Sequence, residues 1–416
     1  MDDRPIIIVG AGLAGLRCAG LLERRGIPWA LLEAQDGPGG RVRTDHVDGF
    51  QLDRGFQVLL TAYPEAAAAL DYAALDLQAF QPGAVVRVAG GFHRVVDPLR
   101  RPTALLSTLR APVGSVADKV RVARVRRRLR RGTLDQLWRR PERTTRQALA
   151  EYGFSADMIE RFWQPLFGGI QLDPELETSS RMFDFVFRML ASGDSALPAA
   201  GMQAIPDQLA AGLTPGRIRY GTTVVAVDPA GAWLEDGELV RGQAVVVATD
   251  GPTAARLVPA VPAPGSNSVR CLYFAAERTP VDEPVIVLNG TGTGVVNNLC
   301  VPSVVAPSYA PSGVSLVSVT VLTGPADPRV LEAAVREQLR GWFGRRVDTW
   351  RLLRRYDIAH AQPAQRPPAL ASPQRPVEVD TGLFVCGDHR DDASINGALT
   401  SGRRAADSLV RSLAMV

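Results

Sequence analysis

Lysine is almost missing from this chain, because Lys119 is the only lysine among 416 residues. The remaining basic side chains are arginines, and the formal net charge of +4 is modest for a chain of this length. Arginine enrichment together with abundant alanine, glycine and proline indicates a bias in base composition more than a function. No recognisable nucleic-acid-binding module accompanies the arginines, so we expect no nucleic-acid partner.

Cysteine is also scarce, and long apolar runs are missing. The four cysteines lie far apart without a CxxC pair (Cys18, Cys271, Cys300 and Cys386). This spacing predicts no disulfide framework and no metal site, and it is typical of a protein from the reducing cytoplasm. No apolar run approaches the roughly 18 residues that cross a bilayer. The first expected strand begins at residue 5, so we expect no signal peptide and a cytoplasmic protein.

The start of the chain carries a nucleotide-binding pattern. Four β-branched residues lead into Gly10-Ala11-Gly12-Leu13-Ala14-Gly15 and then into a helical stretch. Gly10 permits the tight turn, Gly12 lets the backbone approach a pyrophosphate, and Gly15 allows close helix packing. The helix N-terminus offers free N–H groups and a partial positive charge to phosphates. Glu33 ends the next strand, where its carboxylate can accept hydrogen bonds from ribose hydroxyls.

A second glycine turn distinguishes between the dinucleotides. Ala34 follows Glu33, and Gly39-Gly40-Arg41 and Thr44 come next. A nicotinamide enzyme needs no second glycine turn here, whereas FAD extends across the sheet and requires another close approach of the backbone. Arg41 can neutralise phosphate charge with its fork of donors. The pattern therefore favours FAD over NAD.

The end of the chain carries a second cofactor motif. An apolar strand over 383–386 runs into Gly387 and Asp388, and a helix is expected to begin near Ser394-Ile395-Asn396. Asp388 can accept hydrogen bonds from ribityl hydroxyls, and a helix N-terminus stabilises negative charge on a flavin ring. Motifs at both ends of the chain imply one domain that is assembled from distant segments.

These motifs resemble the superfamily of flavin-dependent amine oxidases, phytoene desaturases and protoporphyrinogen oxidases. The matches to GxGxxGLxxAxxLxxxG and LEAxxxxGGRxxT are Gly10, Gly12, Gly15, Leu16, Ala19, Leu22, Gly26, Leu32, Glu33, Ala34, Gly39, Gly40, Arg41 and Thr44. The resemblance implies that Glu33 binds the adenosine ribose and that Arg41 lies beside the pyrophosphate and flavin. It also implies a backbone contact to the adenine at Val225. The same resemblance puts Gly387, Asp388 and the helix start at Ser394, Ile395 and Asn396 against the flavin.

The resemblance and the order of the motifs predict an α/β fold in two parts. A Rossmann-like FAD-binding domain of the glutathione-reductase type takes the discontinuous segments 1–70, 201–265 and 346–416. A mixed α+β substrate-binding domain takes 71–200 and 266–345. Within it we predict a hairpin over 84–96 and a helix-rich region over 103–200. The aromatic residues of that region are interpreted mainly as core, with an apolar pocket as the alternative: Phe162, Trp163, Phe167, Phe183, Phe185 and Phe187.

Departures from the amine oxidase pattern bear on the chemistry. Amine oxidases of this superfamily typically hold a lysine that binds a water near flavin N5, but the single lysine lies in 116–131. Ser394 stands where the family's aromatic cage has a tyrosine, and no cysteine is placed there to bind the flavin covalently. These departures favour the desaturase-like branch, with non-covalent FAD and a lipophilic substrate.

Three residues are candidates for catalytic roles beside the flavin. His389 follows the Gly-Asp pair, where it can act as a base, stabilise the ring or tie the turn. His360 and Gln362 precede the last strand, in a segment that resembles one lining the family's active site. No Ser-His-Asp arrangement, metal-ligand cluster or P-loop is present in the sequence.

The segment 116–131 combines arginines with an apolar stripe at helical spacing. It fits an amphipathic helix at an anionic membrane surface, through which a lipophilic substrate would enter. A solvated surface helix in an arginine-rich protein is the simpler interpretation.

The sequence thus predicts an FAD-dependent oxidoreductase that removes a hydride from a C–C or C–N bond of a lipophilic or natural-product substrate. Three alternatives stay open. These are a flavin-dependent amine oxidase, a flavin-dependent isomerase without net redox change, and a non-catalytic relative that carries a prenyl group or lipid.

Overall fold

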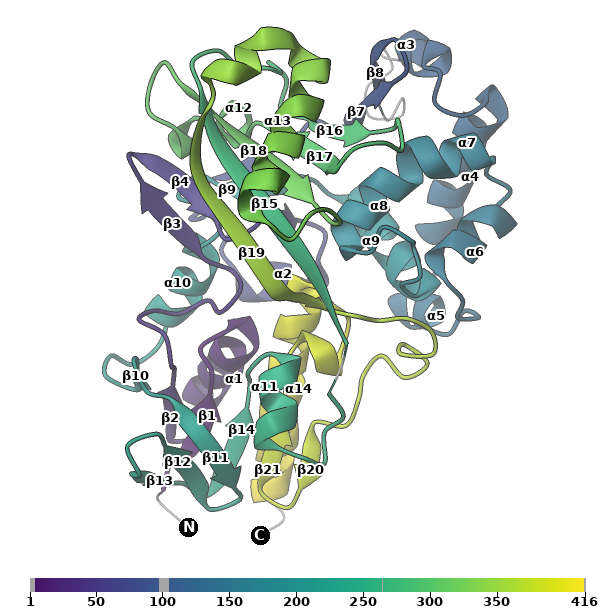
Figure 1. The fold of residues 1–416 in the computed structure, drawn as a ribbon. Coiled ribbons are helices and arrows are strands. Elements are labelled where there is room, and N and C mark those ends of the chain that lie inside the picture. The colour runs from purple at the N-terminus through teal and green to yellow at the C-terminus, as the bar shows by residue number, and fades with distance from the viewer. Residues whose placement is uncertain (1–3, 97–104, 264, 415–416) are drawn as a thin grey trace.

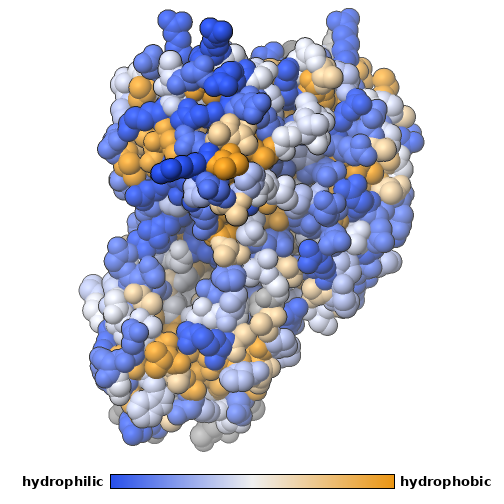
Figure 2. All heavy atoms as spheres, in the orientation of Figure 1, coloured by the Kyte–Doolittle hydropathy of each residue, from blue (hydrophilic) through white to orange (hydrophobic). Residues whose placement is uncertain are grey.

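The computed structural model describes residues 4–96, 105–263 and 265–414. Both chain ends lie at one end of the molecule, beside a parallel sheet (Figure 1). A larger sheet and a group of helices lie at the other end. Figure 2 shows this face with hydrophobic residues in separate patches among hydrophilic ones, and the outline narrows between the two ends.

The first sheet has six strands in the order β10-β2-β1-β14-β21-β20. Its strands are β1 (Ile6–Val9), β2 (Trp29–Leu32), β10 (Ile218–Arg219), β14 (Ala244–Val247), β20 (Glu378–Asp380) and β21 (Leu383–Val385). Neighbours run parallel except β20 and β21, which are antiparallel. Strands β1, β14 and β21 are buried along their whole length, as a parallel sheet covered on both faces requires. The two ends of the chain therefore meet in one sheet.

Both faces of this sheet are covered, and alternate residues of β1 point to different layers. Ile6 and Ile8 pack in the cluster formed with the helices α1 (Leu13–Arg24) and α14 (Ile395–Leu413). Ile7 and Val9 pack in a cluster on the other face. That face is covered by α11 (Gly251–Leu257) and a three-stranded sheet of β11 (Val224–Asp228), β12 (Gly231–Leu234) and β13 (Leu239–Arg241).

The second sheet has seven strands in the order β19-β15-β18-β17-β16-β7-β8. They are β7 (Gly83–Val88), β8 (Gly91–Val96), β15 (Ser266–Ala276), β16 (Ile286–Asn289), β17 (Val296–Cys300), β18 (Ser315–Val321) and β19 (Arg351–Pro363). Strands β7 and β8 form the hairpin that the sequence predicts. Helix α13 (Pro328–Phe343) packs its apolar side against the central strands of this sheet.

Strand β19 bears on the predicted division into domains. It pairs along β15 in the seven-stranded sheet, although the prediction groups 346–416 with the nucleotide-binding segments. Half of its residues are polar or charged, because β19 is an edge strand with much of its length exposed. Only the part of that segment after Pro363 supplies strands to the parallel sheet.

A helical region follows β8 (Figure 1). Its helices are α3 (Leu105–Arg110), α4 (Val116–Leu129), α5 (Leu134–Trp138), α6 (Thr145–Glu151), α7 (Ala156–Met158), the π-helix η2 (Ile159–Trp163), α8 (Gln164–Gln171) and α9 (Ser180–Ser192). Trp163 is fully buried at its centre. Five rings lie 5.1–5.8 Å from it, those of Phe154, Phe162, Phe167, Phe183 and Phe187. Phe185 is also buried, and Phe187 is half-buried against the same cluster. The interpretation of the six predicted aromatic residues mainly as core is therefore confirmed.

The remaining elements are mostly short, and three of them meet at a buried acid. They are β3 (Thr44–Val47), β4 (Phe50–Asp53), β5 (Leu59–Leu60), α2 (Pro64–Ala69), β6 (Leu77–Ala79), β9 (Ser195–Pro198), α10 (Ala204–Ala211), α12 (Pro302–Val305), η3 (Pro307–Tyr309), η4 (Gly344–Thr349) and η5 (Asp388–Arg390). Asp53 accepts hydrogen bonds from Thr44 Oγ1 at 2.6 Å, Met202 N at 3.0 Å and Tyr309 Oη at 2.9 Å. Burial raises the pKa of Asp53 to about 6 despite these donors.

The single lysine caps a helix, and the cysteines are packed in the protein interior. Lys119 Nζ donates to the carbonyls of Leu109 and Ala111, at 3.0 and 2.8 Å, and so satisfies the end of α3. All four cysteines are buried and unpaired. Across the described ranges, no helix combines the length and the apolar character needed to cross a bilayer.

Candidate functional site

The turn after β1 contains three glycines, and the structure gives a different explanation for glycine at each position. Gly10 has a φ of 105°, which favours glycine, and a Cβ on Gly15 would lie 2.0 Å from the Gly10 carbonyl oxygen. These two glycines are required by the protein's own backbone. A Cβ on Gly12 would meet no atom within 4 Å, and its backbone conformation is ordinary. The protein itself therefore does not require glycine at position 12, and space is open in front of it.

Glu33 is held at the carboxyl end of β2, beside this turn. Its side chain is buried and accepts from Ala11 N at 2.6 Å and from Gln35 N at 2.8 Å. Ala34 is exposed next to it. Thr222 N donates to the Glu33 carbonyl oxygen at 2.8 Å, which brings the segment before β11 alongside, while the Val225 side chain on β11 is exposed.

The second glycine turn lies directly against the first. Gly39 N donates to the Ala11 carbonyl oxygen at 2.8 Å, and Gly12 and Gly39 form a parallel bridge. The nearest atom to a Cβ on Gly40 would be Gly12 Cα, at 3.6 Å. Two stretches of backbone without side chains thus line the same open space.

Arg41 and Asp388 join the two ends of the chain. Arg41 Nη2 lies 2.7 Å from Asp388 Oδ1, and Arg41 Nη1 donates to the Ala361 carbonyl oxygen at 3.0 Å. Burial lowers the pKa of Arg41, but the Asp388 carboxylate more than offsets this, so the net shift is upward. A cation from residue 41 and an anion from residue 388 are therefore fixed at the edge of the glycine turns.

The start of α14 lies beside this ion pair. Gly387 has a φ of 141° and donates its N–H to Ser401 Oγ at 3.1 Å. Ser394 caps α14 by accepting from Gly397 N at 3.1 Å. Asn396 Oδ1 accepts from the backbone N–H of Glu65 at 3.0 Å, and Ile395 is half-buried between these two polar residues.

The three candidate catalytic residues differ in their surroundings. His389 is 2 % exposed and neither ring nitrogen has a hydrogen-bond partner. Burial lowers the pKa of His389 to about 4, against the opposing effect of Asp388. Gln362 Nε2 donates to the Ala393 carbonyl oxygen at 2.7 Å. His360 is exposed near the end of β19.

The sequence analysis assigned no role to a pair of buried acids here. Asp391 and Asp392 lie between η5 and α14; burial and mutual repulsion raise the pKa of Asp392 to about 7. Arg404 lies 3.1 Å from Asp391 and opposes the rise there. Gln365 donates to the Asp391 carbonyl oxygen at 2.8 Å and accepts from Ala393 N at 3.0 Å. The adjacent acids in the sequence gave the only signal of this pair.

A second missed group ties three helices together. Glu65 on α2 accepts from Arg17 Nη2 at 2.6 Å on α1 and from Arg403 Nε at 2.8 Å on α14. The three residues are separated by 48 and 338 positions along the chain. Local patterns carry no information about such pairs, so only the folded structure reveals this network.

The arrangement fits a dinucleotide with a pyrophosphate. Open space faces Gly12 and Gly40, a helix N-terminus lies at Leu13, and the buried Glu33 carboxylate lies beside the turn. The imidazole of His389 is a further buried polar group that forms no hydrogen bond within the protein. Within the described part of the chain, no cluster of metal-ligating side chains is found.

Comparisons with known proteins bear on the family and the fold. The family model for flavin containing amine oxidoreductase matches residues 13–410. Coproporphyrinogen III oxidase from Propionibacterium freudenreichii subsp. freudenreichii is 23% identical over 97% of this chain and 90% of its own length. A lycopene-forming phytoene desaturase from Pseudescherichia vulneris is 45% identical over 53 residues, 13% of this chain and 11% of that protein.

A solved structure has the same fold. A putative protoporphyrinogen oxidase from Exiguobacterium sp. 255-15 superposes with a TM-score of 0.74 at 17% identity, over 100% of both chains. The predicted α/β fold class is therefore confirmed. Since the family model covers nearly the whole chain, this protein belongs to the flavin-containing amine oxidoreductase family and is a flavin-dependent oxidoreductase.

Proposed function

We propose that the enzyme binds FAD non-covalently and removes two electrons, as a hydride, from a C–C or C–N bond of a lipophilic substrate. The observation that carries the proposal is the open space that a Cβ on Gly12 would face, at a point where the two glycine turns meet in the bridge between Gly12 and Gly39. Arg41, which follows the second turn, pairs with Asp388 from the other end of the chain. The proposed FAD-binding unit is built from 1–70, 201–265 and the part of 346–416 after β19, with the other segments forming the substrate-binding unit.

The chain's residues have distinct tasks in this proposal. Glu33 accepts from the ribose hydroxyls, and the N–H groups at Leu13 and Ala14 face the pyrophosphate. Asp388 accepts from the ribityl chain, while Ser394, Ile395 and Asn396 hold the start of α14 at the ring. Bound flavin supplies a two-electron acceptor for the substrate hydride.

His389 is proposed as a neutral hydrogen-bonding group. Its lowered pKa keeps the imidazole uncharged at neutral pH, so it offers one N–H and one acceptor nitrogen. Gln362 acts as a positioning residue because its amide holds the Ala393 carbonyl just before α14. His360 stays an untested candidate on the exposed end of β19.

The proposal favours a desaturase-like reaction over amine oxidation. Lys119 satisfies carbonyls at the end of α3, so no lysine is available to hold a water at the flavin. Burial raises the pKa of each cysteine thiol, which disfavours the thiolate needed for a covalent flavin link. Both points support non-covalent FAD and an apolar substrate.

The visible spectrum during anaerobic substrate addition tests this proposal. We expect a yellow protein whose flavin absorbance is bleached by polyenes or other apolar hydride donors. Bleaching by amines alone would instead assign it as an amine oxidase. Product formation without bleaching would indicate an isomerase, and a colourless protein would support the non-catalytic relative.

We also propose peripheral membrane contact through 116–131. The apolar stripe expected to face a membrane packs against the core instead, since Val125 and Leu129 are buried. The proposed contact therefore depends on Val116 and Val120, which are 58% and 45% exposed near the start of α4. A lipophilic substrate would reach the enzyme from such a surface. The variant V116D/V120D should lose co-sedimentation with vesicles while retaining its flavin; unchanged co-sedimentation would contradict the contact.

A further inference from the structure

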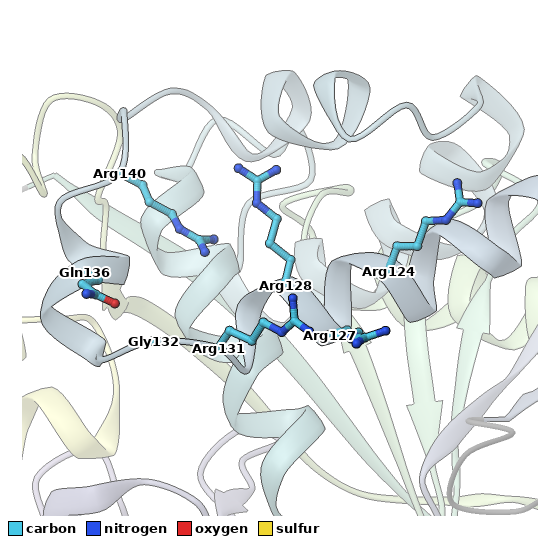
Figure 3. Close-up of a pocket in the computed structure, with 7 residues that line it drawn as sticks. All are labelled: Arg124, Arg127, Arg128, Arg131, Gly132, Gln136 and Arg140. Atoms are coloured by element: carbon cyan, nitrogen blue, oxygen red, sulfur yellow. The ribbon is translucent and has the colours of Figure 1, made fainter.

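A shallow, open surface pocket of about 580 Å³ lies at the end of α4, on elements that do not carry the flavin motifs. We call it the arginine basin; it is lined by Arg124, Arg127, Arg128, Arg131, Gly132, Gln136 and Arg140. Figure 3 shows the guanidinium groups of Arg124, Arg127 and Arg128 on α4 and those of Arg131 and Arg140, each two residues beyond the end of α4 or α5. The seven lining residues include no carboxylate.

Three of the basin's charges are uncompensated. Arg124, Arg127 and Arg131 are exposed, and none of their guanidinium groups forms a hydrogen bond or ion pair with a residue that the structure describes. Arg124 and Arg127 are three residues apart on α4, where like charges destabilise a helix, and Arg131 follows two residues after the end of α4. An anion bound between them would remove this repulsion.

The other members of the basin are held in place. Arg140 Nη1 lies 2.9 Å from Asp184 Oδ2, and the Arg128 guanidinium lies 5.6 Å from the Tyr152 ring centre. Gln136 Oε1 accepts from Thr133 N at 3.1 Å, which leaves the amide N–H groups of Gln136 as donors. The basin therefore presents a partly fixed set of donors and no carboxylate.

We propose that the arginine basin binds clustered phosphate groups. Guanidinium forks match phosphate oxygens bidentately, and several arginines within one cavity suit adjacent phosphates better than a single carboxylate. The phosphates come from anionic phospholipid headgroups or from a soluble polyphosphate. In the first case the basin extends the proposed membrane contact of α4; in the second it is independent of that contact.

The test compares two triple variants with equal loss of charge. R124Q/R127Q/R131Q removes the three uncompensated guanidiniums, and glutamine has a similar helix propensity to arginine. R241Q/R256Q/R345Q is the control, because these exposed arginines lie on β13, α11 and η4, outside the basin. Each protein is titrated with tripolyphosphate by calorimetry and is sedimented with phosphatidylglycerol or phosphatidylcholine vesicles. Bound flavin is quantified in parallel.

The expected loss is specific to the basin variant. A basic residue near an anionic surface changes vesicle affinity by about fivefold, so three losses predict on the order of 100-fold weaker binding to phosphatidylglycerol. A fall of roughly tenfold or more in tripolyphosphate affinity would identify a soluble source. The control variant and the flavin content should stay near wild type in both arms.

Several outcomes would overturn the proposal. One is that the wild type binds neither tripolyphosphate nor phosphatidylglycerol vesicles. Another is that both triple variants bind equally more weakly than the wild type, which would indicate an effect of net charge alone. Tighter binding of a DNA duplex than of either probe would also overturn it. If the wild type and both triple variants all lacked flavin, the FAD assignment would be contradicted, while the comparison of their phosphate binding would still test the basin.

Discussion

Replacing Gly12 with alanine separates cofactor binding from folding. A Cβ at this position meets no protein atom within 4 Å, and the backbone φ of −69° and ψ of 174° suit any residue. The added methyl group therefore lies only in the space that we assign to the pyrophosphate. Gly15 gives no such separation, because its Cβ would collide with the Gly10 carbonyl at 2.0 Å.

Gly12→Ala is expected to change the stability of the apoprotein far less than its affinity for FAD. Gly12 precedes α1 as its N-cap, where alanine costs up to about 1 kcal/mol relative to glycine, and the stiffer unfolded chain offsets part of this. The apoprotein's unfolding free energy should change by less than about 1 kcal/mol. Loss of one or two charge-assisted hydrogen bonds to phosphate costs about 3 kcal/mol, which weakens FAD binding about 100-fold.

The assay combines flavin titration with thermal unfolding of the apoprotein. Gly20→Ala is the matched control, because Gly20 lies on the same helix and its Cβ would meet only Leu213, at 3.7 Å. Alanine there should stabilise the fold by about 0.5–1 kcal/mol and leave FAD affinity unchanged. Wild-type FAD affinity in Gly12→Ala would refute the assignment of the open space to the pyrophosphate.

Three further predictions concern the surroundings of the site. Gly402→Ala should destabilise the protein by about 2–3 kcal/mol in chemical denaturation, because its Cβ would lie 2.2 Å from the Ala14 carbonyl oxygen; an unchanged midpoint would contradict this packing. Arg41→Gln should destabilise the apoprotein by about 1–3 kcal/mol and lower FAD affinity, since Asp388 loses its cation. Arg41→Lys keeps the charge and should recover part of the stability and part of the affinity. If the two variants lost stability and affinity equally, the charge would not be the cause. Asp392 has a folded-state pKa of about 7 against a reference of 3.8, so its contribution to stability is complete below pH 4 and is lost as pH rises through 7. Asp392→Asn should therefore flatten the fall in melting temperature between pH 4 and 7, and an unaltered slope would show that this acid is not responsible.

Much of the geometry of the candidate site could be predicted because local patterns encode it. Gly10 and Gly15 are demanded by a tight turn and a helix crossing, and both requirements leave a fixed spacing in the sequence. The strand, Gly-Asp pair and capped helix at the end of the chain leave a similar signature. The hairpin over 84–96 was also visible, because a glycine turn marks it.

The rest depends on contacts between distant residues. The Glu65 network and the pairing of β19 with β15 have no local pattern, because each joins segments far apart in the chain. Strand β19 in particular reads as polar, since it lies at an exposed edge. The uncompensated state of Arg124, Arg127 and Arg131 was equally hidden, because a sequence does not show whether an acid lies opposite.

Identification of the small molecule released from denatured, purified protein tests the central claim most directly. The account predicts one FAD per chain, released by heat or acid without proteolysis, as expected for a non-covalent cofactor held between Gly12, Gly40, Arg41 and Asp388. A protein that carries no flavin and takes up none on titration with FAD, or that binds only a nicotinamide dinucleotide, would contradict it.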